Sequence, residues 1–163
     1  MQDEVLATIT ASPIRRKMGL LVLFVLGGLL VGLGFKYPAS EFGWKLFLLG
    51  LGGVVLYLAE KMRRATMITL ELTETELRDS TGTVLARVED IVEVVRGSFA
   101  MKPSHGFSVR TRNAMGRRWL PGLWWRVGRR VGIGGVTPSS QTKVMSEILA
   151  LKVAQARDPN QDA

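Results

Sequence analysis

The chain contains no cysteine among its 163 residues, and this absence excludes a group of functions. Without cysteine there is no disulfide framework, no thiolate nucleophile and no cysteine-ligated metal centre. Histidine is nearly absent as well, because His105 is the only one. A zinc site would then need mostly carboxylate ligands, which is an unusual ligand set. We therefore predict no metal site and no cofactor.

Charge is missing from one long stretch and nearly missing from a second. Residues 18–35 read MGLLVLFVLGGLLVGLGF and carry no charged side chain, and residues 42–58 carry only Lys45. As a helix rising 1.5 Å per residue, the first stretch spans about 27 Å, close to the thickness of a bilayer core. Lys45 lies in the first turn of the second stretch, so its ammonium group can reach the interface. The sequence therefore predicts a two-helix transmembrane hairpin over residues 18–58.

Basic residues flank this predicted hairpin at its outer ends. They are Arg15, Arg16, Lys17, Lys61, Arg63 and Arg64. The connection at 36–41 contains Pro38 and is short, so the two helices should be antiparallel neighbours. The positive-inside rule then places both termini in the cytoplasm, with residues 1–17 as a cytoplasmic N-terminal segment. We expect a multi-pass protein of the bacterial inner membrane.

Small residues recur in both predicted membrane helices. Gly28 and Gly32 form a GxxxG pair with Gly27 alongside, and Gly50, Gly52 and Gly53 provide small residues in the second helix. Such residues let helix backbones approach closely within lipid. We favour packing of these glycines within the hairpin, with Gly28, Gly32, Gly50 and Gly53 as the principal packing residues. The alternative is docking onto a membrane-protein partner or onto a second copy of the chain.

After residue 64 the sequence changes to the alternation of apolar and polar residues that is typical of half-buried strands. Candidate strands lie at 68–72, around Leu77, and at 84–88, 91–96, 107–112, 117–120 and 124–133. Turn residues separate them, and the connections leave no room for crossover helices. About seven strands should therefore form antiparallel sheet.

One helix follows the strands. Thr137 and Pro138 match an N-cap followed by proline at the first helical position. Val144, Ile148 and Leu151 then repeat at the spacing of one helical face, which predicts an amphipathic helix. Residues 157–163 are polar and are expected to form a flexible tail.

About seven antiparallel strands that are followed by one helix have the element order of a pleckstrin-homology-type barrel. Residues 68–95, ITLELTETELRDSTGTVLARVEDIVEVV, resemble the opening strands of bacterial pleckstrin-homology-like (PH-like) domains, particularly in the hairpin turn and the ARVEDIVEVV stretch. Two transmembrane helices before such a domain also resemble the layout of many bacterial membrane proteins of this group. The resemblance covers roughly residues 5–156 and implies a PH-like domain at 65–156. It supplies no site residues.

Acidic residues are absent between Glu93 and Glu147, and this interval is rich in arginine and tryptophan. Arginine binds phosphate with bidentate geometry, and tryptophan rings favour the headgroup level of a membrane. We therefore select six residues as candidates for binding an anionic lipid or a partner protein. They are Arg117, Arg118, Trp124, Arg126, Arg129 and Arg130. Strand alternation places Trp125 on the apolar face and Trp124 on the basic face.

Two alternatives to lipid binding concern the same interval. In the first, the tryptophans belong to the core and the arginines form a solvated surface. The second is nucleic-acid binding, which also uses basic and aromatic residues, but no helix-turn-helix, RNP or KH pattern is visible. Nucleic acid is therefore the less favoured partner, after membrane lipids.

No catalytic constellation is visible. Residues 128–135, GRRVGIGG, fail the GxGxxG spacing, and no Walker lysine and serine follow. His105 lies in a segment that looks like a loop tip, and no acid is spaced to form a triad with it. We predict a non-enzymatic scaffold, assembly or interaction module anchored by the hairpin. An anionic-lipid-binding module is the alternative, and an enzyme of unrecognised type is the second alternative.

Overall fold

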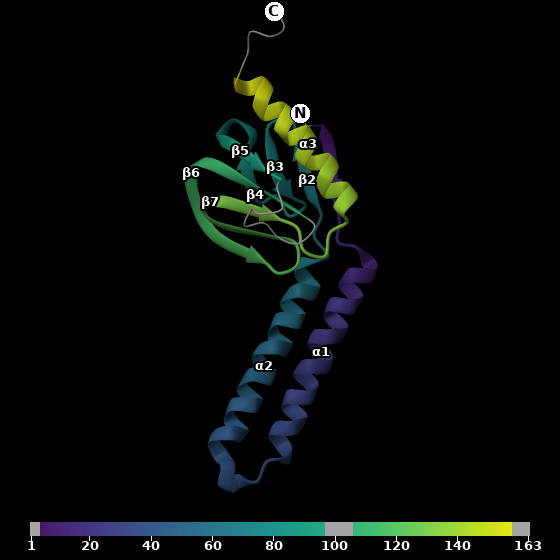
Figure 1. The fold of residues 1–163 in the computed structure, drawn as a ribbon, viewed down its shortest axis with the longest axis vertical. Coiled ribbons are helices and arrows are strands. Elements are labelled where there is room, and N and C mark those ends of the chain that lie inside the picture. Colours follow the sequence, from purple (N-terminus) through teal and green to yellow (C-terminus); the bar gives the residue numbers. More distant parts are fainter. Residues whose placement is uncertain (1–3, 97–105, 158–163) are drawn as a thin grey trace, which may run out of the picture.

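The computed structural model describes residues 4–96 and 106–157, and it shows a helical hairpin projecting from one end of a two-sheet domain (Figure 1). Helix α1 spans Pro13–Lys36 and helix α2 spans Phe42–Ala65, joined through a short 3₁₀ helix, η1, at Ala39–Glu41. The predicted loop tip at His105 and the predicted tail beyond residue 157 lie outside the described residues.

Both helices of the hairpin have 24 residues and are long and apolar enough to cross a membrane. Little of either helix is buried inside the protein, which distinguishes them from core helices of a soluble domain. They run side by side for their full length (Figure 1). The structure therefore confirms the predicted hairpin, with each helix extending beyond its apolar stretch into the basic flank.

Of the predicted glycines, Gly27 and Gly52 are the ones that lie in the close packing between α1 and α2. A Cβ added to Gly52 would lie 2.7 Å from Val31 Cγ2, and one added to Gly27 would lie 2.7 Å from Leu56 Cδ2. Gly34 is also buried, one heptad beyond Gly27 on the same helical face.

The prediction that Gly28, Gly32, Gly50 and Gly53 pack within the hairpin is wrong. A Cβ added to any of these four glycines meets nothing within 4 Å. Gly28 follows Gly27 by one residue, which is a rotation of about 100° around the helix axis and carries it off the interface. These four glycines therefore face outward.

The domain contains a four-stranded sheet, in the order β1-β2-β3-β4, and a three-stranded sheet, in the order β5-β6-β7. All pairings are antiparallel, as predicted. The strands are β1 Val5–Ile9, β2 Leu70–Thr73, β3 Glu76–Asp79, β4 Val84–Arg87, β5 Ile91–Val95, β6 Phe107–Leu120 and β7 Trp124–Ile133. A 3₁₀ helix, η2, at Val88–Asp90 connects the two sheets, and helix α3 at Ser139–Arg157 ends the described chain.

Strand β1 is an element that the sequence did not predict. It lies before the hairpin and pairs with β2, which follows the hairpin, with Ile9 opposite Leu70. Ile9 is fully buried. Residues 5–9 of the predicted N-terminal segment therefore belong to the first sheet, and their pairing with β2 fixes both ends of the hairpin on the domain side.

Strand β6 merges two predicted strands, so the expected number of strands is reached through different elements. Its pairing with β7 changes register between Arg110 and Met115, and again between Met115 and Arg118. Opposite Met115, Gly128 has a φ of +58°, a left-handed conformation that suits glycine. These irregularities let the β6–β7 hairpin bend back toward α2 (Figure 1).

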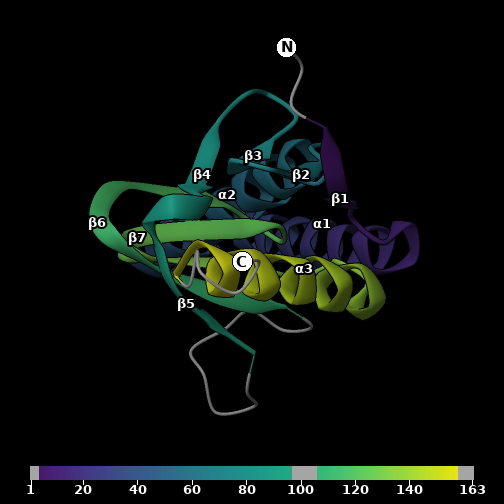
Figure 2. The ribbon, with the colours of Figure 1, turned by 90° about the horizontal axis from the view of Figure 1, so that it is seen from above.

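Helix α3 packs against β1 of one sheet and β5 of the other, and it thereby covers one side of the core (Figure 2). Its buried apolar residues are Met145, Leu149 and Val153. The predicted face is correct for Ile148, which is partly buried against the core, but wrong for Val144 and Leu151, which are 51% and 66% exposed.

The helix turns its polar Thr142 and Ser146 inward in place of the predicted face. The Ser146 hydroxyl donates to the carbonyl of Lys143 at 2.8 Å, and the Thr142 hydroxyl donates to that of Ser139 at 3.0 Å. Their burial therefore leaves no hydroxyl unpaired, and hydropathy spacing alone points to the wrong face. The helix also starts at Ser139, after the predicted start, and the Thr137 hydroxyl caps nothing.

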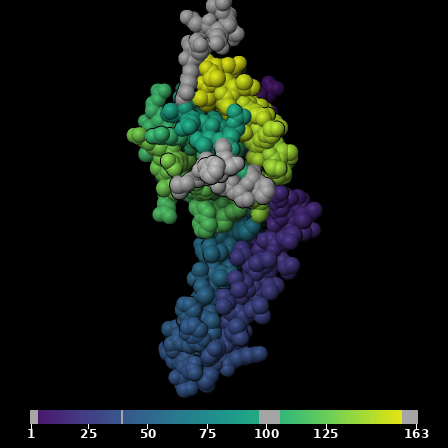
Figure 3. Space-filling model, viewed as in Figure 1, coloured from purple at the N-terminus to yellow at the C-terminus, as the bar shows by residue number. Residues whose placement is uncertain are grey.

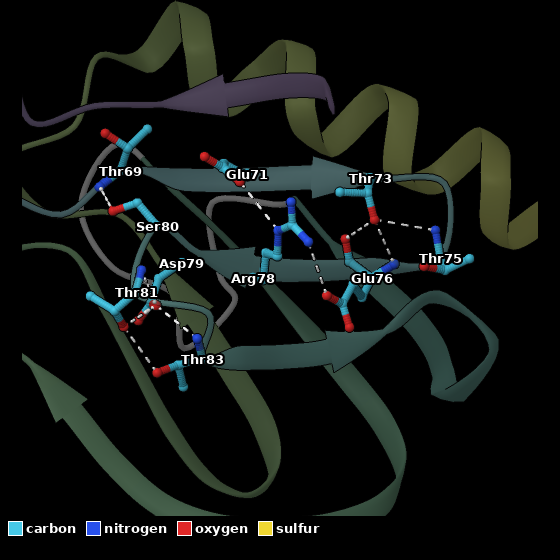
Figure 4. A network of polar contacts seen from close by, with 10 residues as sticks. All are labelled: Thr69, Glu71, Thr73, Thr75, Glu76, Arg78, Asp79, Ser80, Thr81 and Thr83. Carbon is cyan, nitrogen blue, oxygen red and sulfur yellow. Dashed lines mark hydrogen bonds and ion pairs between the residues drawn. The ribbon is translucent and has the colours of Figure 1, made fainter. Parts of the chain in front are cut away.

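The turn from β3 to β4 is fixed by Asp79, whose carboxylate lies inside the turn (Figure 4). Its Oδ1 accepts hydrogen bonds from the backbone N–H groups of Thr81 and Thr83, both at 3.0 Å, and from the Thr81 hydroxyl at 2.5 Å. Gly82 has a φ of +81°, which closes the turn. The predicted turn at 79–82 is confirmed, and Asp79 has a structural role in it.

Candidate functional site

The bent β6–β7 hairpin and the hairpin of membrane-length helices meet at one end of the domain. Gly122, in the turn between β6 and β7, has a φ of +79°, and a Cβ added there would lie 3.2 Å from Met62 Cε of α2. On the other helix, the N–H of Ser12 donates to the carbonyl of Val136 at 2.8 Å, and Arg15 Nη1 donates to that of Thr137 at 3.1 Å. The surfaces of β6 and β7 therefore lie directly beside the end of α2 (Figure 3).

A groove with a volume of about 570 Å³ lies at this junction. Its lining residues are Lys61, Arg117, Arg118, Trp119, Trp125 and Val127. We call this the basic–aromatic groove. Helix α2 contributes Lys61, and the tip of the β6–β7 hairpin contributes the rest, including the cross-strand partners Trp119 and Trp125. None of the lining residues is acidic.

Among the described residues, no acidic side chain pairs with the cations of the groove. In the last turns of α2, the Glu60 carboxylate pairs with Arg63 and with Arg64, each at 2.7 Å. Lys61 takes no part in this cluster, and its ammonium lies 4.9 Å from the centroid of the Trp119 ring. Within residues 4–96 and 106–157, no ion pair involves Lys61 or the two groove arginines.

Exposed apolar side chains surround the groove at the same end of the domain. Trp119 is 47% exposed and Val127 is 51% exposed, although both belong to a paired hairpin. Met67, two residues after α2 ends, is exposed as well. Large apolar groups that stay exposed beside basic ones are typical of a surface that meets another phase or another molecule.

The sequence predicted Arg117 and Arg118 as binding residues, and the structure brings both into this groove. It does not do so for Trp124, which is only 1% exposed and belongs to the core. The prediction from strand alternation is therefore reversed. Trp125 faces the groove instead, with its ring packed so closely on Gly132 that a Cβ there would lie 2.4 Å from Trp125 Cε2.

Arg126 is committed to holding the fold together. Its Nε donates to the carbonyl of Gly116 at 2.8 Å, and its Nη1 donates to that of Val84 in β4, also at 2.8 Å. The guanidinium carbon lies 5.9 Å from the Trp124 ring centroid. Burial, and secondarily the charge of Arg118, lower the pKa of Arg126 below its ordinary value. This arginine links the two sheets and is not available as a ligand-binding group.

Arg129 and Arg130 are exposed on β7 but do not line the groove. Sequence reasoning missed four of the lining residues, Lys61, Trp119, Trp125 and Val127, as site residues. The sequence indicates only that Lys61 helps to set the membrane orientation of the hairpin. Nothing in the sequence shows that a residue at the end of α2 meets the tip of a distant β-hairpin. The signal for Trp119 was present, because it lies next to Arg118 in the basic interval.

Acidic side chains gather elsewhere and serve the sheets. Arg78 forms ion pairs with Glu71 at 3.2 Å and with Glu76 at 3.6 Å (Figure 4). In the part of the chain that the structure describes, no group of three His, Cys, Asp or Glu residues is arranged to hold a metal ion.

No protein-family model matches this chain, and neither a curated protein nor a solved structure matches it. The geometry of the basic–aromatic groove is therefore the basis for the functional proposal.

Proposed function

We propose that this is a non-enzymatic, membrane-anchored protein whose domain rests on an anionic lipid surface. The observation that carries the proposal is the position of the basic–aromatic groove. It lies at the end of the domain from which two membrane-length helices project, with Lys61 of α2 in its wall.

If α1 and α2 cross a bilayer, the end of α2 lies at the headgroup level. The groove cations are then within reach of lipid phosphates, and the exposed Trp119 and Val127 are within reach of the glycerol region. Each basic residue near an anionic leaflet contributes about 1 kcal/mol, so the three groove cations contribute about 3 kcal/mol. The hairpin already tethers the domain, and this free energy would therefore orient the domain on the surface.

The orientation and location that we propose are those predicted from the sequence: a bacterial inner membrane, with both termini in the cytoplasm. The basic flanks of the hairpin support this, since positive residues favour the cytoplasmic side. The pairing of β1 with β2 is compatible with it, because it holds both flanks on one side. The antiparallel strands and the C-terminal helix are likewise compatible with the proposed PH-like domain.

The experiment that tests the proposal uses the absence of cysteine, which makes any introduced cysteine the unique labelling site. The variants Met67→Cys, beside α2 but outside the groove lining, and Ala154→Cys, near the far end of α3, are each spin-labelled. The full chain is reconstituted into vesicles of phosphatidylcholine, with or without phosphatidylglycerol.

We expect the label at residue 67 to be shielded from a water-soluble relaxation agent, more strongly when phosphatidylglycerol is present, because the domain is then held against the leaflet. The label at residue 154 should stay accessible in both kinds of vesicle. Equal accessibility of the two labels in anionic vesicles would contradict the proposal.

A second candidate is the scaffold or interaction module, and the outward glycines favour it. Gly28, Gly32, Gly50 and Gly53 leave open, small-residue faces on both helices, to which a membrane-protein partner or a second copy can pack closely. Purification in mild detergent should then recover a stoichiometric complex that Gly32→Leu dissociates. Recovery of the wild-type chain as a lone monomer would count against this candidate.

A further inference from the structure

Building on the proposed membrane-surface function, we infer that the basic–aromatic groove binds one anionic phospholipid molecule in a defined site. Lys61 of α2 and the arginines Arg117 and Arg118 of β6 bind its phosphate. The rings of Trp119 and Trp125 contact its glycerol and upper acyl segments. The lipid then bridges the membrane anchor and the domain.

The groove has the size and the amphipathic lining that such a ligand requires. Its volume of about 570 Å³ falls within the range of roughly 300–1,000 Å³ that is typical of small-molecule sites. Three of its six lining side chains are cations, and the other three are apolar or aromatic. A phospholipid headgroup presents the same division, with a charged phosphate next to an apolar glycerol ester region.

The electrostatics of the hairpin tip favour a bound anion. Arg118 lies directly opposite Arg126 in the β6–β7 register, and like charges in that position repel. Arg126 is occupied by backbone carbonyls, and no acidic residue lines the groove. A phosphate held by Arg118 would compensate this charge, with arginine providing a bidentate fork.

Lys61 connects the site to the membrane anchor. Its ammonium lies 4.9 Å from the Trp119 ring centroid, which aims it into the groove while Glu60 engages Arg63 and Arg64. A cation–π contact at an exposed position is weak. This contact positions the ammonium without competing strongly against a phosphate oxygen.

The apolar wall favours a lipid over free phosphate. Inorganic phosphate would use the three cations and leave Trp119, Trp125 and Val127 uncovered. Trp119 and Val127 are about half exposed, so an acyl-bearing ligand would remove apolar surface from water that free phosphate cannot cover. The ligand class is therefore a phospholipid with a net negative headgroup.

The test is native mass spectrometry of the full chain, purified in detergent and titrated with phosphatidylglycerol or phosphatidylcholine. We expect one phosphatidylglycerol per chain to be retained at concentrations where phosphatidylcholine is not. Lys61→Gln and Arg118→Gln should each weaken retention about tenfold, which corresponds to about 1.4 kcal/mol. Arg129→Gln removes the same charge from β7 outside the groove and should change retention less than twofold.

The aromatic wall is tested with Trp119→Leu and Trp119→Phe, and circular dichroism reports whether each variant is folded. Leucine should weaken phosphatidylglycerol retention several-fold, and phenylalanine, which keeps a ring, should weaken it less. Inorganic phosphate serves as the competitor and should displace the lipid only weakly, because it gains nothing from the apolar wall.

Three results would overturn the inference. They are equal losses in the Lys61, Arg118 and Arg129 variants, complete displacement by inorganic phosphate, and equal retention of the two lipids. Each leaves the membrane-surface proposal intact if the label at residue 67 is still shielded in anionic vesicles. Loss of that shielding refutes the membrane-surface function itself.

Discussion

Replacing Arg126 by methionine tests whether one side chain joins the two sheets of the domain. Arg126 lies on β7, and its guanidinium reaches the carbonyl of Val84 on β4, which belongs to the other sheet. A second bond reaches the carbonyl of Gly116 within its own hairpin. Methionine keeps an unbranched apolar stem of similar length and removes both donors.

The expected loss follows from these two bonds. A hydrogen bond from a charged donor contributes about 1.5–3 kcal/mol, and partial exposure of Arg126 places each of its bonds at the low end. The two bonds together then contribute about 3 kcal/mol. Methionine also removes the repulsion from Arg118 and the cost of burying a charge, and this offsets about 1 kcal/mol of the lost free energy of unfolding. The net destabilisation of Arg126→Met should be about 2 kcal/mol.

The assay is thermal unfolding of the full chain in detergent, followed by near-ultraviolet circular dichroism of the tryptophans. For a domain of this size, 2 kcal/mol lowers the midpoint by roughly 10 °C. Arg129→Met, on the same strand but exposed, should leave the midpoint within about 2 °C, and Arg126→Lys should fall between the two. A midpoint for Arg126→Met equal to that for Arg129→Met would mean that the apolar core alone joins the sheets.

Three further substitutions test packing and turn geometry. Gly52→Ala should separate the membrane-length helices and lower their thermal stability in detergent, whereas Gly53→Ala, which faces open space, should not; equal effects would disprove the assigned interface. Gly132→Ala should displace the ring of Trp125, change the tryptophan emission spectrum and lower the free energy of unfolding by about 1–3 kcal/mol. An unaltered spectrum would argue against this contact. Asp79→Ala removes the acceptor of the β3–β4 turn and should cost about 2 kcal/mol in thermal unfolding, with Asp79→Asn milder; a neutral alanine variant would show that the turn forms without it.

The features that were predicted correctly are those with a strong local signal. An uncharged run as long as residues 18–35 admits few structures other than a membrane-length helix. The alternation along Leu70, Leu72 and Leu77 likewise reports strands whose inner face is buried. In both cases the information lies within one element and does not depend on its neighbours.

The errors arose where tertiary contacts decide between two local alternatives. Trp124 and Trp125 are adjacent, and only the tight turn before β7 determines which ring enters the core. The buried face of α3 is centred on Met145, Leu149 and Val153, which is rotated from the predicted face. Ser146 can be buried on this face because its hydroxyl is satisfied within the helix. Strand β1, VLATI, lacks the regular alternation of apolar and polar residues that marks the other strands.

The candidate site was predicted in part. Arg117 and Arg118 were identified from the lack of acidic residues around them, which is a property of the sequence alone. Their partner Lys61 belongs to another element, and only the bend of the β6–β7 hairpin brings it close. The same lack of acidic residues gave a wrong prediction for Arg126, because this arginine of the basic interval holds the two sheets together and does not line the groove.

If α1 and α2 cross a membrane, the pairing of β1 with β2 makes completion of the domain depend on how the two helices insert. Ile9 and Leu70 are partners in the sheet, although both membrane-length helices lie between them in the chain. In a bilayer, insertion of only one helix would leave these two strands on opposite sides, so the sheet could not be completed. A wrongly inserted chain would keep the edge of β2 unpaired and open to proteases and chaperones. Completion of the sheet would then act as a check on topology during biogenesis, and a fragment beginning at residue 65 would lack the first strand of the sheet.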